Sequence, residues 1–385
     1  MTRRLRVAHL LTQDRGGPVD VTLDLAAALL ATGEADVRVF GPPPARGTDV
    51  IAGHHEAVDL PRKGDLAAGL RVRDALLAWQ PDVVHAQDRR AGLVAASLRR
   101  RLPVAHTYHG VPDDVGEPWF RRQSGALGPS AYTRVVLTAD SALTRALDRT
   151  VVPSPTMARF LRDRLRVPAE RITHIDNCVR LPESSPPTDP VRRLVFAGLL
   201  VERKGLLDLL EALATPGTMP AGATLTVVGD GPQRQTAQRR ARRRDLAGRV
   251  QFLGFRADVP RLLREHDALV QPSRMEQQPL VVAAAMAAGK PVLATDTGGV
   301  ADMLAVPGAV SYLAEPGNVA DLARVLRALF ADSDPGRTGR LLAARARERF
   351  APEVCADRHL ALYGELLRSR EDRGQPVPVR ERERS

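Results

Sequence analysis

The chain has 385 residues, of which 44% are apolar and 26% are charged. This length and composition allow about two or three domains with buried cores, and they exclude a single small module and a disordered polymer. Lysine and arginine outnumber the acidic residues by 56 to 45, and the resulting net charge of +11 favours anionic ligands. Because arginines occur along the whole chain, we prefer a general compositional bias as the main cause of this surplus.

The number of cysteines and the length of the apolar runs indicate the cellular compartment. Cys178 and Cys355 are the only cysteines, and two isolated thiols favour neither a disulfide framework nor a zinc site. The apolar run Val7–Leu11 is typical of a first strand rather than of a signal peptide. No run of roughly 18 or more apolar residues predicts a membrane span. We expect a cytoplasmic protein, with peripheral contact to the inner face of an anionic membrane left open.

Short apolar runs, each followed by a helical pattern, recur along the chain, as in α/β proteins with parallel sheets. In the first half, the predicted strands are Val7–Leu11, Asp36–Phe40, Val83–Ala86, Val104–His106, Val135–Leu137, Val151–Pro153 and Ile172–Ile175. In the second half, they are Leu194–Ala197, Leu225–Val228, Val250–Leu253, Ala268–Gln271, Val292–Ala294 and Val310–Tyr312. The clearest helix is Val19–Leu30, which Gly33 would end in a left-handed conformation.

A proline-rich stretch divides the chain. Residues 181–190 contain four prolines and cannot form a helix or a central strand. We therefore predict two doubly wound, Rossmann-like domains that face a central cleft: residues 1–180 and residues 191–350, joined by this linker. The amphipathic stretch 351–368 predicts a closing helix that packs back on the N-terminal domain, and the charged residues 369–385 predict a disordered tail.

Ligands of doubly wound folds bind at the carboxyl ends of the strands, so the loops there are the candidate sites. Gly16 and Gly17 precede the first helix, where backbone amides and the helix N-terminus favour a phosphate; a tight turn is an equally good interpretation. Lys204 follows the first strand of the second domain. It is one of three lysines beside 53 arginines, which favours a need for a compact ammonium over a solvated side chain.

Two further residues stand at predicted strand ends. Glu276 precedes a predicted helix, where a carboxylate either caps the helix or accepts hydrogen bonds from sugar hydroxyls. His109 follows the strand Val104–His106, although a lone histidine is more often a packed residue. No nucleophile elbow or His-Glu-x-x-His motif occurs, and no Asp-x-Asp motif stands at a strand end, so hydrolase and metal chemistry have little support.

As an ordered set, these loops resemble retaining glycosyltransferases of family 4, which have the GT-B fold. The motifs that carry the resemblance are Gly16-Gly17, Pro81–His85, Tyr108–Gly110, Gly198…Lys204-Gly205, Gly229–Pro232, Phe252–Gly254, Pro272-Ser273…Glu276, Ala285–Thr295 and Gly298-Gly299. Each motif is weak alone, and together they span the chain from Val7 to about Leu367.

The resemblance implies a hexosyltransferase of carbohydrate biosynthesis that retains configuration and needs no metal or other cofactor. The donor would be a UDP- or GDP-sugar, with UDP preferred, held mainly by the second domain; a hydroxyl acceptor (a lipid, a polysaccharide or a small metabolite) would lie against the first. His109, Lys204 and Glu276 would be catalytic. Donor contacts would come from Gly16, Gly17, Gly198, Lys204, Gly229, Gly254, Phe255, Gln277, Gln278 and Leu280.

The chain departs from the family pattern at several positions. Ala284 stands where relatives carry a second glutamate for the ribose, and Leu199 stands where they carry an arginine beside the diphosphate. Asn177-Cys178 replaces a usual Asn-Gly, and Pro279 lacks an N–H to donate. The alternative is therefore a weakened or inactive subunit that binds sugar nucleotides.

The arginine run 239–244 raises two further alternatives, a nucleic-acid binder and a protein that rests on an anionic membrane. No aromatic residue interrupts this run to stack on bases, so a solvated helix face is our preferred interpretation and no nucleic-acid partner is expected.

Overall fold

The computed structural model describes residues 4–59 and 65–376, which form two compact units. Unit 1 contains the chain up to Gly110, then Ser130–Cys178, and the chain from Pro352 onward. Unit 2 contains Val111–Pro129 and Val179–Ala351. The structure differs from the predicted boundaries at residues 111–129, which the sequence places in the N-terminal domain and which instead pack with unit 2.

Unit 1 is a parallel α/β sheet in the order β3-β2-β1-β4-β5-β6-β7. Its strands are β1 (Leu5–Leu10), β2 (Ala35–Gly41), β3 (His55–Ala57), β4 (Val83–Ala86), β5 (Val104–Thr107), β6 (Arg149–Val152) and β7 (Ile172–His174). Its helices are α1 (Gly17–Ala31), α2 (Leu66–Trp79), α3 (Arg89–Ala96), α5 (Ala131–Ala146), α6 (Pro155–Asp163) and α14 (Pro352–Asp372), with 3-10 turns η1 (Thr48–Ile51) and η2 (Ala169–Arg171).

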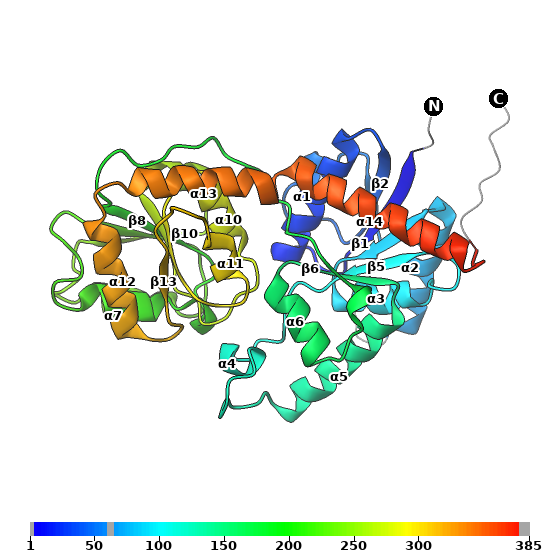
Figure 1. Ribbon diagram of the computed structural model, residues 1–385, viewed down its shortest axis with the longest axis horizontal. Helices are drawn as coiled ribbons and strands as arrows, with labels where there is room; N and C mark the ends of the chain where they lie inside the picture. The colour runs from blue at the N-terminus through cyan, green and yellow to red at the C-terminus, as the bar shows by residue number, and fades with distance from the viewer. Residues whose placement is uncertain (1–3, 60–64, 377–385) are drawn as a thin grey trace. The chain divides into compact units, whose positions relative to one another are not determined.

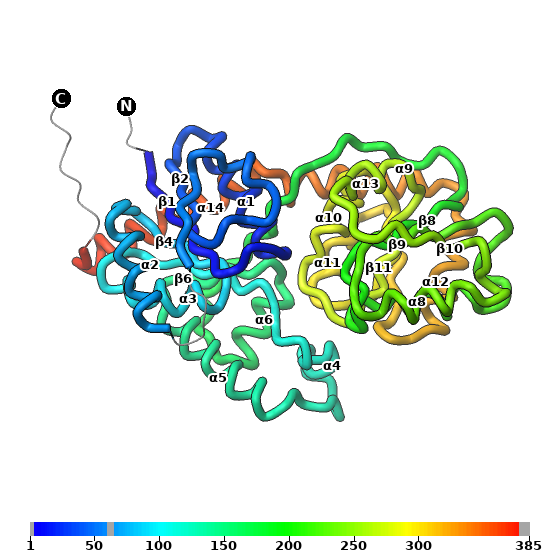
Figure 2. Tube along the Cα trace, turned by 180° about the vertical axis from the view of Figure 1, so that it is seen from behind, coloured from blue at the N-terminus to red at the C-terminus, as the bar shows by residue number. Residues whose placement is uncertain are grey.

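The C-terminal helix α14 packs against α1, and the two lie side by side in Figures 1 and 2. Tyr363 and Leu366 of α14 share a core with Leu29 of α1. Arg370 is 1% exposed because it donates hydrogen bonds to the carbonyls of Arg99 and Arg100 and to that of Leu102. Residues 369–372 are therefore helical rather than the start of a disordered tail, whose predicted end (377–385) lies outside the described residues.

The predicted strands of unit 1 overlap the observed ones with one exception. Val135–Leu137 is wrong as a strand, because these residues lie inside α5. The Ser130 hydroxyl accepts a hydrogen bond from the Thr133 amide and caps this helix. Val135 is 69% exposed while Leu137 is buried, which fits a helix and not a central strand. The short strand β3 was not predicted, since it has no apolar run.

Unit 2 is a second parallel sheet, in the order β10-β9-β8-β11-β12-β13. Its strands are β8 (Arg193–Ala197), β9 (Thr224–Val228), β10 (Val250–Gly254), β11 (Ala268–Gln271), β12 (Val292–Thr295) and β13 (Tyr312–Ala314). Its helices are α4 (Glu117–Phe120), α7 (Leu206–Ala214), α8 (Arg234–Ala241), α9 (Val259–Glu265), α10 (Leu280–Ala287), α11 (Val300–Leu304), α12 (Val319–Ala331) and α13 (Pro335–Phe350), with the 3-10 turn η3 (Glu202–Lys204).

The proline-rich stretch 181–190 has no helix or strand and packs on unit 2. The Ser185 amide donates to the carbonyl of Ala288 at 2.8 Å. A β-carbon on Gly289 would lie 2.5 Å from the Ser184 hydroxyl oxygen, so the two segments are in close contact. The stretch 181–190 thus packs against unit 2 and is not an extended linker without contacts.

Candidate functional site

The strand order of unit 2 reverses beside β8, because β9 lies on one side of this strand and β11 lies on the other. Ligands of open α/β sheets bind at such a switch point, outside the carboxyl ends of the strands. The loop after β8 carries Lys204, and the loop after β11 carries Glu276. Topology therefore brings two predicted site residues, 72 positions apart in the sequence, to the same edge of one sheet.

Lys204 and Glu276 form a close ion pair between Nζ and Oε1. Their side chains are 17% and 10% exposed, so water screens the pair only weakly. The Ser273 hydroxyl also donates to Glu276 Oε1 at 3.0 Å, and Gln271 Nε2 donates to the Ser273 oxygen at 2.9 Å. Glu276 is consequently held in one orientation by two partners from its own loop and the facing one.

Glycines allow the loops around this pair to approach closely. Gly205 has φ of +69°, and a β-carbon there would lie 1.9 Å from the carbonyl oxygen of Pro272. Gly298 has φ of +49°, and a β-carbon there would lie 1.9 Å from the carbonyl oxygen of Glu276. Side chains at either position would therefore push the Glu276 loop out of place.

Two predicted donor-binding glycines have their amides engaged in backbone hydrogen bonds. Gly198 N–H donates to the carbonyl of Val228 at 3.0 Å, and Gly229 N–H donates to that of Gly254 at 2.7 Å. A β-carbon on Gly229 would lie 1.9 Å from the Gly198 carbonyl oxygen, so close packing explains this glycine. These residues shape the edge of the sheet without offering free amides.

The remaining predicted donor contacts of unit 2 flank the same edge. Phe255, directly after β10, is 68% exposed, an unusual position for a large aromatic side chain. Gln277 and Gln278 are each 7% exposed, and both polar side-chain atoms of Gln277 are buried without a hydrogen-bond partner in the described part of the chain. Leu280 begins α10 on the loop that follows Glu276, and the amides of Val282 and Ala283 in its first turn donate to the Pro279 carbonyl.

The predicted residues of unit 1 lie at the carboxyl ends of β1 and β5. Gly16 has φ of +104° and precedes α1, a conformation that favours glycine. A β-carbon on Gly17 would meet nothing within 4 Å, so packing does not require a glycine there. His109 Nε2–H donates to Gln87 Oε1 at 3.3 Å, and Gln87 Nε2–H donates to His9 Nδ1 at 2.9 Å.

This chain of hydrogen bonds defines the protonation state and the tautomer of His109. Burial, together with the neighbouring His106, lowers the pKa of His109 to about 3, so the ring is neutral near pH 7. Since Nε2 carries the proton donated to Gln87, Nδ1 is a hydrogen-bond acceptor. His85 differs, because Tyr363 and Thr107 occupy its two ring nitrogens at 2.7 and 2.8 Å in the core.

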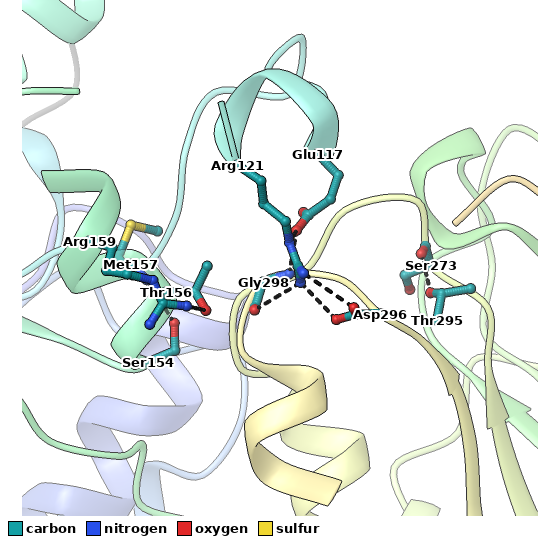
Figure 3. A network of polar contacts seen from close by, with 10 residues as sticks. All are labelled: Glu117, Arg121, Ser154, Thr156, Met157, Arg159, Ser273, Thr295, Asp296 and Gly298. Carbon is teal, nitrogen blue, oxygen red and sulfur yellow. Dashed lines mark hydrogen bonds and ion pairs between the residues drawn. The ribbon is translucent and has the colours of Figure 1, made fainter. Parts of the chain in front are cut away.

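Sequence reasoning missed a polar network around α4. Arg121 donates to both Asp296 oxygens, at 2.8 and 3.2 Å, and to the Gly298 carbonyl at 3.3 Å (Figure 3). Glu117 Oε1 accepts from Arg121 Nε at 2.5 Å and from the Gly298 amide at 2.8 Å. Glu117 is 4% exposed, and this burial raises its pKa. A Glu-x-x-x-Arg spacing is common on helices, so the sequence carries no distinctive signal for it.

The predicted site residues thus fall into two sets. Lys204, Glu276 and their neighbours meet within unit 2, whereas Gly16, Gly17 and His109 belong to unit 1. Over residues 4–59 and 65–376, no three His, Cys, Asp or Glu side chains gather as metal ligands would. Every helix in these ranges is too short or too polar to cross a membrane.

Comparison with solved structures defines the fold. The chain is similar to HepE of Anabaena in complex with UDP-glucose, with a TM-score of 0.77 and 21% identity over 94% of this chain and 100% of that one. It is also similar to sucrose-phosphate synthase of Thermosynechococcus elongatus, with a TM-score of 0.72 and 22% identity over 95% of this chain and 100% of that one. Both relationships establish the fold, two Rossmann-like domains of the GT-B type.

Sequence comparison gives the family. Residues 15–182 match Glycosyltransferase Family 4, and residues 191–332 match Glycosyl transferases group 1. Glycogen synthase of Mycobacterium tuberculosis is 30% identical over 293 residues, 73% of this chain and 68% of that protein. The 2-deoxystreptamine glucosyltransferase of Streptomyces kanamyceticus is 31% identical over 225 residues, 57% of this chain and 54% of that protein. The chain belongs to glycosyltransferase family 4, as its motifs predict.

Proposed function

We propose that this glycosyltransferase moves a hexosyl group from a nucleoside diphosphate sugar to an acceptor hydroxyl with retention of configuration. UDP is the preferred nucleotide, and the reaction uses no metal or other cofactor. The Lys204–Glu276 pair at the switch point of unit 2 is the observation that carries this proposal. HepE, which shares the fold, is known in complex with UDP-glucose.

Lys204 and the start of α10 would act on the leaving group. Cleavage of the sugar–phosphate bond leaves negative charge on the nucleoside diphosphate, and stabilising that charge lowers the barrier. The Lys204 ammonium has three N–H groups, of which one faces Glu276, so others remain for phosphate oxygens. The first amides of α10, including that of Leu280, add a partial positive charge beside them.

Glu276 and His109 would hold the sugar. The carboxylate of Glu276 accepts hydrogen bonds from sugar hydroxyls, and its fixed orientation would align the ring for attack on the same face. The neutral Nδ1 of His109 would accept a further hydroxyl proton. Gly17 has open space in place of a side chain, which would let its amide approach the diphosphate.

Phe255 would stack on the nucleobase, because an aromatic side chain that is 68% exposed at this edge has room for a planar partner. Ala284 offers no carboxylate to the ribose, so stacking and diphosphate contacts would supply more of the affinity for the nucleotide.

A nucleotide panel and a product assay test the proposal together. UDP, GDP and their glucose conjugates are compared by thermal shift, since binding to the native state raises the melting temperature. UDP and UDP-glucose should give the larger shifts, and proton NMR of the transferred sugar should show the anomeric configuration of the donor. An inverted product, or no shift with any nucleotide, would refute the proposal.

The alternative is a subunit that binds sugar nucleotides without turnover. Leu199, where relatives carry arginine, is 63% exposed and has no charge to offer a diphosphate. Ala284 packs against an apolar core and likewise lacks the carboxylate. Saturable UDP binding with neither hydrolysis nor transfer of the sugar would favour this alternative over an active enzyme.

A further inference from the structure

A pocket of about 680 Å³ lies within unit 2, at the carboxyl ends of β12 and β13. One wall is formed by residues from 116 to 123, which include α4. The other is formed by Asp296, directly after β12, and by residues 313–317, which are the end of β13 and the loop after it. Arg274, two positions before Glu276, completes the lining. The volume of the pocket lies in the range of small-molecule sites, roughly 300–1,000 Å³.

The pocket shares no residue with the proposed donor site, but its Asp296 wall belongs to the loop that packs against Glu276. Asp296 lines the pocket and lies two residues before Gly298. Gly298 packs closely against Glu276, since a β-carbon on it would lie 1.9 Å from the Glu276 carbonyl oxygen. Glu117 also lines the pocket and accepts a hydrogen bond from the Gly298 amide, while Arg121 donates to Asp296. The wall is therefore fixed by hydrogen bonds to Asp296 and Gly298 (Figure 3), on the loop that packs against Glu276.

The charges of the lining disfavour an anionic ligand. Arg121 is already paired with Asp296 and Glu117, and Arg274 is paired with Asp208 and Glu202. Three carboxylates line the pocket, those of Glu117, Asp296 and Glu315, against these two neutralised guanidinium groups. The carboxylates of the lining therefore outnumber its guanidinium groups, and this excess of acceptors suits hydroxyl and ammonium donors.

Glu117 adds a specific acceptor to this wall. Its Oε2 is buried and has no hydrogen-bond partner in the described part of the chain, and burying such an oxygen is unfavourable. A donor that reached it from the pocket would relieve that penalty. Apolar surface comes from Pro118, Leu313 and Pro316, enough for one face of a saturated ring but not for an acyl chain.

We propose that this pocket holds the acceptor, and that the acceptor is a small polyhydroxylated ring, preferably one that bears an amine, rather than a phosphorylated or lipid molecule. The assignment rests on the proposed function, because it places an acceptor hydroxyl next to the Glu276 loop. Residues 111–129 then supply one side of the acceptor site, although the chain on either side of them belongs to unit 1.

Gly116 provides a way to fill the pocket without strain. It lines the pocket, its φ and ψ of −78° and 152° suit any residue, and a β-carbon there would meet only the Pro118 ring, at 3.8 Å. Gly116→Leu should therefore block the pocket in a folded protein. Gly116→Ala is the matched control, because it makes the same backbone change and adds little volume.

Binding to the full chain is measured by calorimetry in the presence of UDP. The probes are glucosamine, myo-inositol, glucose 6-phosphate and octanol, and glucosamine should bind most tightly, followed by myo-inositol. Gly116→Leu should weaken both by tenfold or more, whereas Gly116→Ala changes them less than threefold. Tighter binding of glucose 6-phosphate or octanol, no binding of either polyol, or no effect of Gly116→Leu would overturn the assignment.

Binding of UDP to the same samples separates the two proposals. If UDP binds and the polyols do not, the acceptor assignment fails while the proposed donor chemistry stands. If UDP does not bind either, the proposed function itself is refuted.

Discussion

Replacing Gly298 with alanine would test how the Glu276 loop is positioned. Gly298 has φ of +49°, and its new β-carbon would lie 1.9 Å from the Glu276 carbonyl oxygen and 2.9 Å from the Gln277 α-carbon. Both atoms belong to the backbone, so no flexible side chain can rotate away. The loop that carries Glu276 would have to move by more than an ordinary thermal displacement, and the ion pair with Lys204 would move with it.

The expected loss of stability has two parts. An alanine in the left-handed region costs about 1–2 kcal/mol, and forcing extra volume into a packed contact costs about 1–3 kcal/mol more. We therefore expect Gly298→Ala to lower the free energy of unfolding by about 2–5 kcal/mol. Turnover of the donor should fall at least tenfold at temperatures where the variant remains folded, because a displacement near 1 Å at a reacting centre has roughly this effect or more.

Gly217→Ala is the matched control, since Gly217 has φ of +74° but a β-carbon there would meet nothing within 4 Å. It should show the conformational part of the loss alone and keep its turnover. Stability is measured by urea unfolding, and turnover by release of nucleoside diphosphate. Equal losses of stability in the two variants, or full turnover in Gly298→Ala, would refute the proposed contact between Gly298 and the Glu276 loop.

Three other predictions follow from particular contacts. Burial lowers the pKa of His9 to about 3 and that of His359 to about 4, so the folded state binds fewer protons than the unfolded state below about pH 6.5. The free energy of unfolding should therefore fall by about 2 kcal/mol per histidine between pH 7.5 and pH 5. An unchanged urea midpoint would contradict this. Arg370→Met should lower the free energy of unfolding by about 1–3 kcal/mol because carbonyls lose their donor, whereas the exposed Arg373→Met should have no effect in the same assay. Phe255→Ala should weaken UDP binding about three- to tenfold in calorimetry if the ring stacks on the base, and an equal affinity would exclude that role.

Strand positions were predictable where an apolar run is fully buried. Val83–Ala86 and Ala268–Gln271 match β4 and β11 residue for residue, because central strands of parallel sheets are apolar on both faces. The strand prediction for residues 135–137 was wrong because a three-residue apolar run also fits one turn of a helix. β3 failed because an edge strand with half-exposed residues carries no apolar pattern.

The order of loops along the chain predicted Lys204 and Glu276 at one edge of a sheet, because parallel strands deliver both loops there, but it did not predict their ion pair. The membership of residues 111–129 could not be predicted in this way. Their attachment to unit 2 depends on Arg121 and Glu117 reaching Asp296 and Gly298, about 175 or more positions away, and neither side chain is unusual in its local sequence. Gly198 and Gly229 show a similar limit, since a glycine kept for close packing looks the same as one kept for a phosphate.

Donor turnover by Lys204→Ala, set against its neighbour Arg203→Ala, tests the central claim most directly. Arg203 belongs to the same short turn and is 38% exposed, so both variants remove one positive charge from η3. Initial rates of UDP-glucose cleavage are measured at saturating donor, after thermal unfolding shows that both variants fold. We expect Lys204→Ala to be slower by tenfold or more and Arg203→Ala to stay within twofold of the parent. Equal rates for all three proteins would contradict the role of this ammonium in catching the departing diphosphate.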